Sequence, residues 1–492
     1  MKVLLVYPEF PDTFWSLKYA IRFISKKSAY PPLGLLTVAA MLPQNWHKKL
    51  IDMNVKRLKN SHIKWADIVF IGAMSLQYEP AKRVVQRCKK AGVRVVAGGP
   101  LFTALPDKFE DIDYLVLDEA EVTLPKFLDH FSRGNPERIY TSKERPGLER
   151  TPLPLWELID KKQYSSMNIQ YSRGCPFNCE FCEITVLYGH KPRLKSAKQV
   201  VAELESLYTA GWRGSVFFVD DNFIGNKEVL KNDVLPAMIK WSEEKSYPFT
   251  FHTEASINMA DDERLIDMMV SAGFDTVFIG IETPNQESLT ECGKHQNKNR
   301  DLLSCVDFIQ RHGLQVQGGF ILGFDSDPDT IFDTLIKFIQ SSGIVVAMVG
   351  LLNAPRGTRL FQRLCNENRI TSDITGNNTD FSMNFIPRMD FNKLTEGYRK
   401  VVNTIYSPKN YYKRVKDFLS KDAGIKHCGA IEANGVTAFI KSIFKLGILG
   451  KERRYYWKLV LSTLFNKPSL VPAAVTFAIC GYHFRKIYGL RL

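Results

Sequence analysis

The chain has 492 residues, of which 45% are hydrophobic, 12% aromatic and 24% charged. This composition excludes collagen-like, low-complexity and wholly disordered proteins, and at about 150 residues per domain it suggests roughly three domains. The net charge of +14 is confined to residues 391–492, which carry 19 Lys and Arg against 5 Asp and Glu, while the first 390 residues are neutral. We therefore expect a local anionic partner and no nucleic acid.

The first apolar run, residues 3–6, is too short for the apolar core of a signal peptide. Nine cysteines is an odd number, which without an export signal favours reduced thiols or metal ligands over a disulfide framework. The expected location is therefore the cytoplasm. Residues 468–484 form a nearly uncharged apolar segment, but it contains two Pro and a His. We expect this segment to be interfacial or buried and not to span a membrane.

Residues 1–133 alternate short β-rich runs with amphipathic helical patterns. The runs are residues 2–8, 49–54, 67–73, 93–99 and 113–119. Continuous apolar strands separated by helices predict a doubly wound parallel sheet, whose ligands lie beyond the carboxyl ends of the strands. The residues expected at this edge of the sheet are Ser75, Gly98, Gly99, Glu119 and Glu121. The Gly pair could let the backbone approach a bulky ligand, or it could simply make a tight turn.

Residues 134–165 are irregular and contain four Pro, which is typical of an interdomain linker. Residues 166–390 contain six further βα repeats. Their strands are expected at residues 168–174, 215–222, 249–257, 276–283, 315–324 and 345–353. This series predicts a complete or partial barrel with its chemistry at the carboxyl ends of the strands, and a second doubly wound sheet is the alternative. His252 and Tyr188 are candidates for substrate contact at the barrel mouth.

Residues 391–492 are expected to form a helical, basic and aromatic C-terminal domain. Lys451, Arg453, Arg454 and Lys458 surround the aromatic residues 455–457. Basic side chains beside Tyr and Trp on an amphipathic helix suit an anionic membrane surface. The alternative is a helical cap with a solvated basic face.

Three cysteines, Cys175, Cys179 and Cys182, lie in one loop after the first expected strand of the second series. Each can give a thiolate to an iron–sulfur cluster, which leaves one iron without a protein ligand. A structural zinc site would need a fourth ligand, for which His190 is the only close candidate.

This Cys-x-x-x-Cys-x-x-Cys loop, with Phe181 before the last Cys, resembles the radical S-adenosylmethionine (SAM) superfamily. The resemblance implies that the three Cys hold a [4Fe-4S] cluster that binds SAM and cleaves it reductively to a 5′-deoxyadenosyl radical. It also implies an electron donor such as flavodoxin or ferredoxin. By position, residues Asp220, Asp221 and Asn222 would lie near the SAM amino group, and Glu282 near the ribose. Buried acids at strand ends could equally be helix caps.

A doubly wound domain, a Pro-rich linker and a radical SAM barrel together resemble the cobalamin-binding branch of that superfamily. Residues 31–36, 98–100 and 119–121 resemble the pattern of that branch, although Asp118 stands where its members commonly have Gly. The Asp-x-His-x-x-Gly motif of cobalamin mutases is absent. If cobalamin binds, we expect that no His holds the lower face of the cobalt.

Residues 384–389, which follow the turn at 355–358 and precede the helical extension, resemble the subgroup that contains the bacterial hopanoid methylases. This implies a cobalamin-dependent methyltransferase acting on an unactivated carbon of a hopanoid or other isoprenoid lipid, with the tail at the inner face of the cytoplasmic membrane. One alternative is a non-methylating cyclisation, oxidation or rearrangement, and another is a non-catalytic metal-binding module. An RNA methylthiotransferase is disfavoured, because the only Cys before residue 175 is Cys88.

Overall fold

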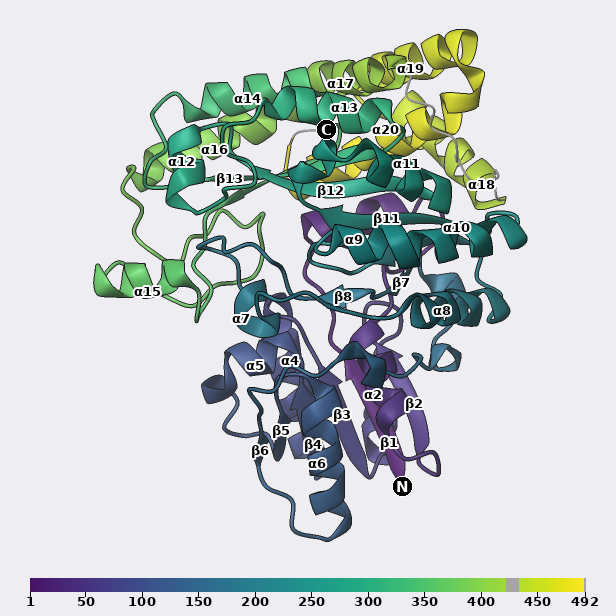
Figure 1. Cartoon of the computed structure of the whole chain (residues 1–492), viewed down its shortest axis with the longest axis vertical. Helices are drawn as coiled ribbons and strands as arrows, with labels where there is room; N and C mark the ends of the chain where they lie inside the picture. Colours follow the sequence, from purple (N-terminus) through teal and green to yellow (C-terminus); the bar gives the residue numbers. More distant parts are fainter. Residues whose placement is uncertain (422–432, 491–492) are drawn as a thin grey trace.

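We describe a computed structural model of the chain, which covers residues 1–421 and 433–490. An N-terminal α/β domain, a central βα domain and a C-terminal helical region follow one another along the long axis of the molecule (Figure 1). The predicted fold class is confirmed.

The first sheet has six parallel strands in the order β2-β1-β3-β4-β5-β6. They are β1 (Lys2–Tyr7), β2 (His47–Asp52), β3 (Ile68–Gly72), β4 (Arg94–Gly98), β5 (Tyr114–Val116) and β6 (Ile139–Tyr140). Alternate residues of β1 enter two different cores, since Val3 packs with helices α2 (Leu33–Met41) and α6 (Ala120–Ser132), and Leu4 packs with α4 (Tyr78–Lys90). Helices therefore cover both faces, and the strand order reverses between β1 and β3, where such sheets bind ligands.

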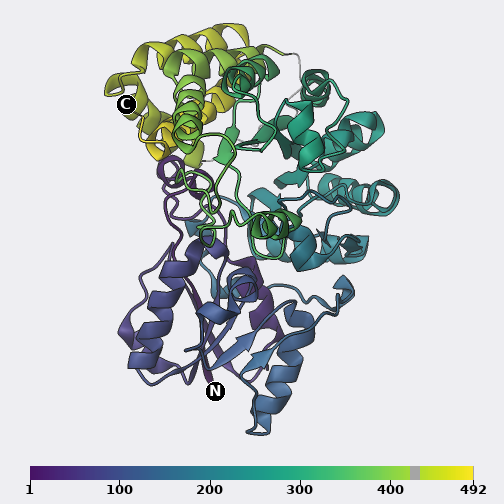
Figure 2. The same cartoon turned by 90° about the vertical axis from the view of Figure 1, so that its left-hand side faces the viewer.

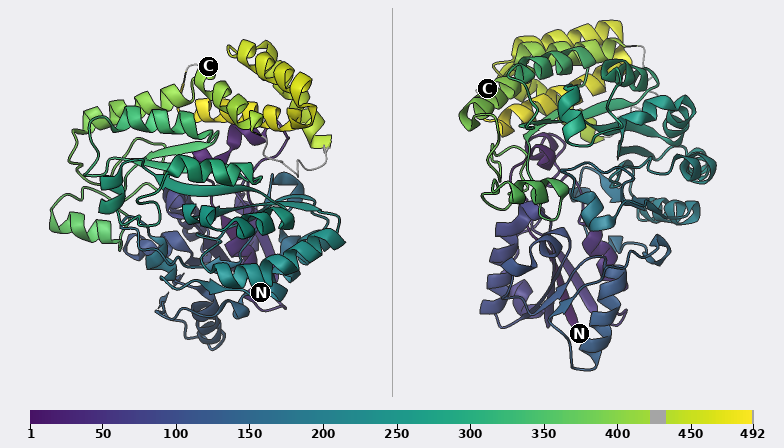
Figure 3. Two further views of the ribbon diagram at one scale, coloured as in Figure 1. Left: turned by 45° about the horizontal axis from the view of Figure 1, so that its top comes forward. Right: turned by 60° about the vertical axis from the view of Figure 1, so that its left-hand side comes forward.

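The second sheet is parallel and has the order β14-β13-β12-β11-β10-β7. Its strands are β7 (Met167–Ile169), β10 (Gly214–Phe218), β11 (Phe249–Ala255), β12 (Phe274–Glu282), β13 (Gln315–Leu322) and β14 (Ala347–Leu351). Each strand neighbours the next one in sequence without a reversal, which rules out a second doubly wound sheet. Among the described residues β14 and β7 do not pair, so the barrel is partial. The helices of this series pack on its outer face (Figure 3).

The segment between β1 and α2 leaves the first sheet and enters the interior of the barrel, where it also meets the C-terminal helices (Figure 2). The Trp15 ring meets Phe278 of β12 edge-on at 5.2 Å. The Tyr30 hydroxyl lies 3.2 Å from Nε2 of His252, whose Nδ1 lies 3.0 Å from Ser215 Oγ. These contacts hold His252 deep in the barrel and away from the cavity described below, so the expected role at the barrel mouth is wrong. Burial lowers the pKa of His252 to about 4.

The C-terminal region consists of helices packed beside the barrel. They are α16 (Phe391–Ile405), α17 (Pro408–Ser420), α18 (Ala433–Ser442), the π-helical η9 (Ile443–Ile448), α19 (Arg453–Asn466) and α20 (Val471–Ile487). Helix α20 is buried among the others, which agrees with the prediction for residues 468–484. None of the helices in the described ranges has the length and apolar character needed to cross a bilayer. Two cations of the basic tail are internal, because Arg414 donates to the Ile344 carbonyl at 2.9 Å and Arg485 pairs with Glu452 at 2.5 Å.

Candidate active site

A cavity of about 840 Å³ lies between the first domain and the mouth of the barrel. This volume is near the upper end of the range for small-molecule sites, about 300–1,000 Å³. One side, the first-domain wall, is formed at the ends of β1, β3, β4 and β5 and includes Tyr7, Met74, Ser75, Gly98, Gly99 and Glu119. The other side, the barrel wall, includes Phe181, Cys182, Tyr188, Asp221, Gly280 and Glu282. The carboxyl ends of the two parallel sheets therefore face the same space.

The loop with the three cysteines follows β8 (Ser172–Arg173) and brings Phe181 and Cys182 to the barrel wall. It starts at Gly174, whose φ is +95° and where a Cβ would lie 2.9 Å from the Gly189 carbonyl oxygen, so only glycine fits this turn. All three thiols are free of disulfides. His190, the candidate fourth ligand for zinc, is exposed.

The donor set of this loop fits a cluster better than a single ion. In the described residues no three Cys, His, Asp or Glu side chains form a group that could hold one metal ion. A cluster spreads its thiolates over three irons, so the sulfurs need not converge on one point. Burial raises the pKa of Cys182 to about 12, so its thiolate form requires a neighbouring cation of the kind that a cluster iron provides.

Asp220, Asp221 and Asn222, which follow β10 after Val219, separate into two groups. Asp221 lines the cavity, and burial followed by the charge of Asp220 raises its pKa to about 7. Asp220 does not line the cavity, because its carboxylate accepts the Tyr171 amide at 3.0 Å and the Ser172 hydroxyl at 2.5 Å. Asn222 accepts the Ser256 amide at 3.2 Å and ties β10 to β11. Asp220 and Asn222 therefore brace the strand ends beside Asp221, and the cofactor contact expected for these residues stays a prediction.

Glu282 lies at the end of β12 with an unusual backbone. Its φ is +64°, and the register with β13 shifts between Gly280 and Glu282. A non-glycine residue in this region costs of order 1–3 kcal/mol, and such strain concentrates at functional sites. The carboxylate accepts from Lys294 Nζ at 2.6 Å and faces the cavity. Tyr188 also lines the cavity, and burial raises its pKa to about 12.

The first-domain wall depends on glycine. Gly99 has a φ of +94°, and a Cβ there would lie 3.2 Å from the Ala73 carbonyl oxygen. A Cβ on Gly98 would lie 2.5 Å from the Val116 carbonyl oxygen. Both glycines also line the cavity with Ser75, so the tight turn forms part of the cavity surface. Among the described residues that line the cavity there is no His.

Glu119 and Glu121 line the cavity, but their carboxylates bind arginines of the barrel domain. Arg173 contacts Glu119 at 2.8 Å and Glu121 at 2.8 Å, and Arg193 contacts Glu119 at 2.7 Å. Burial alone would raise the pKa of Glu121, but its bonds to Arg173 outweigh burial and bring the pKa to about 2. The pair therefore joins the two domains at the edge of the cavity, and the cofactor role expected for it stays a prediction.

Asp118 stands where members of the cobalamin-binding branch commonly have Gly, and its backbone shows why a residue other than glycine is tolerated at this position. Its φ is +58°, a conformation that Gly adopts freely and Asp adopts more readily than most residues. The carboxylate accepts from Thr141 Oγ1 at 2.5 Å and from the Ser142 amide at 2.9 Å. Asp118 thus fixes the start of the linker.

Sequence reasoning missed the basic partners of the site. Arg173 directly precedes Gly174-Cys175, and this position was the one available signal that it belongs to the site. Arg193 and Lys294 are 74 and 12 positions from the carboxylates that they bind, and no motif marks either residue.

Comparison with known proteins places all three parts of the chain. Residues 169–339 match the radical SAM superfamily, residues 20–128 match the B12 binding domain, and residues 358–490 match a domain of unknown function (DUF4070). The chain is 39% identical to an uncharacterized methyltransferase of Synechocystis sp., over 98% of this chain and 91% of that protein. It is 31% identical to the hopanoid C-2 methylase of Rhodopseudomonas palustris, over 94% of this chain and 90% of that protein.

Solved structures share the fold. The structure of TsrM, a radical SAM methyltransferase from Kitasatospora setae with cobalamin and a [4Fe-4S] cluster bound, superposes with a TM-score of 0.62 at 15% identity and covers 98% of this chain and 99% of that chain. The cobalamin-dependent enzyme OxsB superposes with a TM-score of 0.60 at 15% identity, over 100% of this chain and 84% of that chain.

Proposed function

We propose a lipid substrate for this chain, which belongs to the family of cobalamin-dependent radical SAM methyltransferases. The reaction is methylation of an unactivated carbon of a hopanoid or other isoprenoid lipid. The observation that carries the proposal is the cavity between the two domains, because it brings the wall suited to cobalamin and the wall suited to the cluster and SAM to one space. The similarity to a hopanoid C-2 methylase over nearly the whole chain supports this choice of substrate class.

Each wall has a distinct task in this proposal. Cys175, Cys179 and Cys182 hold the cluster, while Asp221 and Glu282 bind polar groups of SAM. Ser75, Gly98 and Gly99 form the surface that receives cobalamin. When bound, these groups supply a radical that removes a hydrogen atom and a methyl group that replaces it. The protein orients the two groups and excludes water from the space between them.

Further apolar side chains line the cavity on the barrel side and provide a surface for a polycyclic hydrocarbon. They are Phe278, Ile321, Met348 and Leu352. A mainly apolar pocket with a few polar groups fixes an apolar ligand through shape and buries its surface.

A lipid substrate requires access to a bilayer, and the C-terminal helices carry an exposed apolar face. Its members are Val436, Ile440, Phe444, Ile448 and Leu449 on α18 and the π-helical segment that follows, and Leu461, Leu464 and Phe465 on α19. Phe444 is 62% exposed and Phe465 81% exposed. Soluble proteins rarely expose large contiguous apolar patches without a function. We include in the proposal that this face contacts the inner leaflet of the cytoplasmic membrane.

The exposed apolar face differs from the aromatic cluster expected from the sequence. Tyr456 is buried and Trp457 is half-buried, with its Nε1 donating to the Gly447 carbonyl at 3.0 Å. Of that cluster only Tyr455 is exposed. The charges near the face are the exposed side chains Lys451, Arg453, Arg454 and Lys458, which suit anionic headgroups.

The function is tested by anaerobic turnover of the cluster-loaded protein with SAM, cobalamin, a bacterial lipid extract and reduced flavodoxin or ferredoxin. S-adenosylhomocysteine and 5′-deoxyadenosine are quantified together. We expect both to rise with lipid, and S-adenosylhomocysteine to require cobalamin. Deoxyadenosine without S-adenosylhomocysteine would contradict methylation of these lipids and favour a cyclisation, oxidation or rearrangement.

Membrane contact is tested by sedimentation with vesicles that contain anionic lipid. We expect Phe444→Asp combined with Phe465→Asp to abolish co-sedimentation. The matched control is Leu153→Asp, an exposed apolar residue of the linker, at 46% exposure, which should bind as the unchanged protein does. Equal binding of all three proteins would contradict the membrane role and leave the turnover assay unaffected.

A further inference from the structure

Helix α15 (Arg359–Asn366) lies apart from the C-terminal helices α16 to α20 and on the side of the molecule where α7 (Ile184–Tyr188) lies (Figure 1). Helix α7 directly follows the cysteine loop. Its first turn is bonded to the middle of that loop. Arg359 Nη2 donates to the Asn178 carbonyl at 2.5 Å, and the Leu360 amide donates to the Glu180 carbonyl at 3.0 Å. The segment between Cys175 and Cys182 is therefore held by residues nearly two hundred positions later in the chain.

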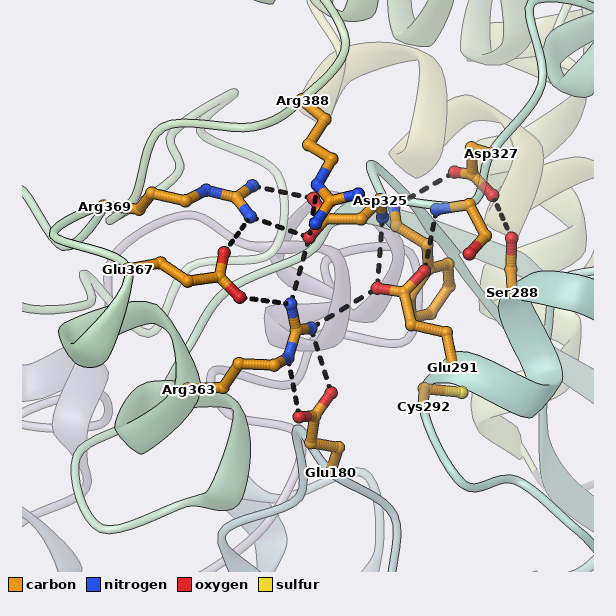
Figure 4. Close-up of polar contacts among 12 residues, drawn as sticks. Glu180, Ser288, Glu291, Cys292, Asp325, Asp327, Arg363, Glu367, Arg369 and Arg388 are labelled. Atoms are coloured by element: carbon orange, nitrogen blue, oxygen red, sulfur yellow. Dashed lines mark hydrogen bonds and ion pairs between the residues drawn. The ribbon is translucent and has the colours of Figure 1, made fainter.

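The side chain of Arg363 adds a stronger connection (Figure 4). Its Nε donates to Glu180 Oε1 at 2.8 Å and its Nη2 to Glu180 Oε2 at 3.1 Å, while Nη1 donates to Asp325 Oδ2 at 3.0 Å. A bidentate guanidinium–carboxylate pair is shorter and stronger than a neutral hydrogen bond and fixes the relative orientation of its partners. Glu180 directly follows Cys179.

The anchor behind Arg363 is rigid. Asp325 is 8% exposed at its side chain and binds Arg369 at 2.7 Å as well. The amides of Asp325 and Ser326 donate to Glu291 at 3.1 and 2.7 Å. Asp327 accepts from Ser288 Oγ at 2.7 Å and from the Gly323 amide at 2.9 Å. The loop after β13 therefore has little freedom to follow a displaced Arg363.

Glu180 is also held from the opposite side. Its amide donates to the Cys292 carbonyl at 2.8 Å, and the next residue, Phe181, lies with its ring centroid 6.3 Å from that of Phe324. The amide of Glu180 is thus held at Cys292, and its carbonyl and carboxylate are both held by α15, so two separate segments fix this residue. Because Cys179 directly precedes Glu180, these contacts also restrict the backbone of Cys179 and the position of its thiol.

We propose that Arg363 is a positioning residue for the cluster, acting through Glu180 to hold Cys179 in the orientation in which it binds iron. This gives a task to the start of a region that matches a domain of unknown function. The inference rests on the assignment of Cys175, Cys179 and Cys182 as cluster ligands. It does not depend on which substrate is methylated.

The test compares full-length Arg363→Gln, Arg363→Lys and Arg388→Gln after anaerobic cluster loading. Arg388 is the matched control, because it lies 3.5 Å from the same Asp325 but is 66% exposed. Loss of a residue that orients a metal ligand typically costs about 10- to 100-fold in metal affinity. We expect Arg363→Gln to release iron to a chelator about tenfold faster and to alter the electron paramagnetic resonance spectrum of the reduced cluster. Arg363→Lys should be intermediate, and Arg388→Gln unchanged.

A normal iron-release rate and spectrum in folded Arg363→Gln would overturn the proposal, even if its thermal stability fell. If Arg363→Gln does not fold, the same measurements are made on Glu180→Gln. This variant keeps the ion pair between Arg363 and Asp325 and weakens only the bond between Arg363 and the cysteine loop. Normal iron release in Glu180→Gln would then overturn the proposal. Absence of a cluster from the unchanged protein would overturn the assignment of the three cysteines as ligands as well. This outcome is distinct from a failure of the Arg363 proposal alone, in which the unchanged protein binds a cluster.

Discussion

The two walls of the cavity are lined by different kinds of residue. Part of the first-domain wall, at Ser75, Gly98 and Gly99, is backbone and small residues. The barrel wall presents groups that carry charge or bind metal, namely Cys182, Asp221 and Glu282. Under the proposed function the first surface receives cobalamin and the second holds the cluster and SAM, so we expect substitutions in one wall to affect one cofactor and leave the other bound.

The walls are joined by a third set of residues, which form ion pairs between the two domains. Glu119 and Glu121 come from the first domain, and Arg173 and Arg193 come from the barrel domain. Ion pairs that are buried to this degree hold the walls at a fixed separation, because neither partner can be exposed without leaving the other charge unpaired.

The largest effect is expected for Cys179→Ala. The variant should lose the visible absorption of the cluster and all SAM cleavage, because the remaining thiols cannot hold three irons. Cobalamin binding, measured by gel filtration and absorption, should be unchanged. The matched control is Cys305→Ala, since Cys305 is a free, partly buried cysteine on helix α13 (Leu302–Arg311), outside the loop. Loss of cobalamin binding in Cys179→Ala would contradict the assignment of a different cofactor to each wall.

Removing a charge from the junction should destabilise the protein at neutral pH. Breaking a buried pair costs about 3–5 kcal/mol, so Glu121→Gln should lower the unfolding temperature by several degrees at pH 7. The folded pKa of Glu121, about 2, lies below its unfolded value. The stabilisation is therefore complete above the usual Glu pKa of about 4.3 and disappears as the pH falls toward 2.

The measurement is thermal unfolding of both proteins between pH 7 and pH 3. The difference between the unchanged protein and Glu121→Gln should be constant from pH 7 to about 5.5 and then shrink. A difference that grows on acidification would mean that the ion pair with Arg173 is not the source of the stabilisation.

Gly99→Ala should weaken cobalamin binding without affecting cluster content. The φ of +94° and the contact of 3.2 Å with the Ala73 carbonyl both oppose a Cβ. Relief of this strain, about 1–3 kcal/mol, would displace the backbone of the cavity wall, and we expect the displaced wall to bind cobalamin roughly tenfold or more weakly. Gly92→Ala is the matched control, because Gly92 also has a positive φ, +69°, but nothing within 4 Å of its Cβ position. Equal cobalamin affinity in the two variants would contradict a role for this wall.

The smallest effect is expected for Glu282→Gln. Gln keeps one acceptor oxygen but loses the charge, and a hydrogen bond to a charged group is about 1 kcal/mol stronger than a neutral one, so the Kd for SAM should rise about five- to tenfold. Equilibrium binding of SAM to the cluster-loaded protein measures this, with cobalamin affinity as the internal control. An unchanged Kd for SAM would place the ligand away from Glu282.

The sequence was most informative where the relevant residues are neighbours. The apolar runs predicted the parallel strands, and the cysteine loop predicted the cluster site, because spacing within one loop is a local property. The two-residue strand β6 was missed inside the predicted linker, since Ile139–Tyr140 is too short to show a period. Arg173 and Glu121 are 52 positions apart, and nothing in a single sequence pairs them. The same limit hid the connection between α15 and Glu180.

The aromatic stack between the two ends of the fold has a consequence for biosynthesis. Phe14 and Phe484 lie with ring centroids 4.2 Å apart, and the Phe14 carbonyl contacts His483, 469 positions later. At about 5–20 residues per second, the ribosome delivers that partner roughly half a minute to a minute and a half after Phe14 is made. The interior of the barrel is therefore sealed on this side only after nearly the entire chain has been translated, which leaves a period in which the nascent barrel remains open.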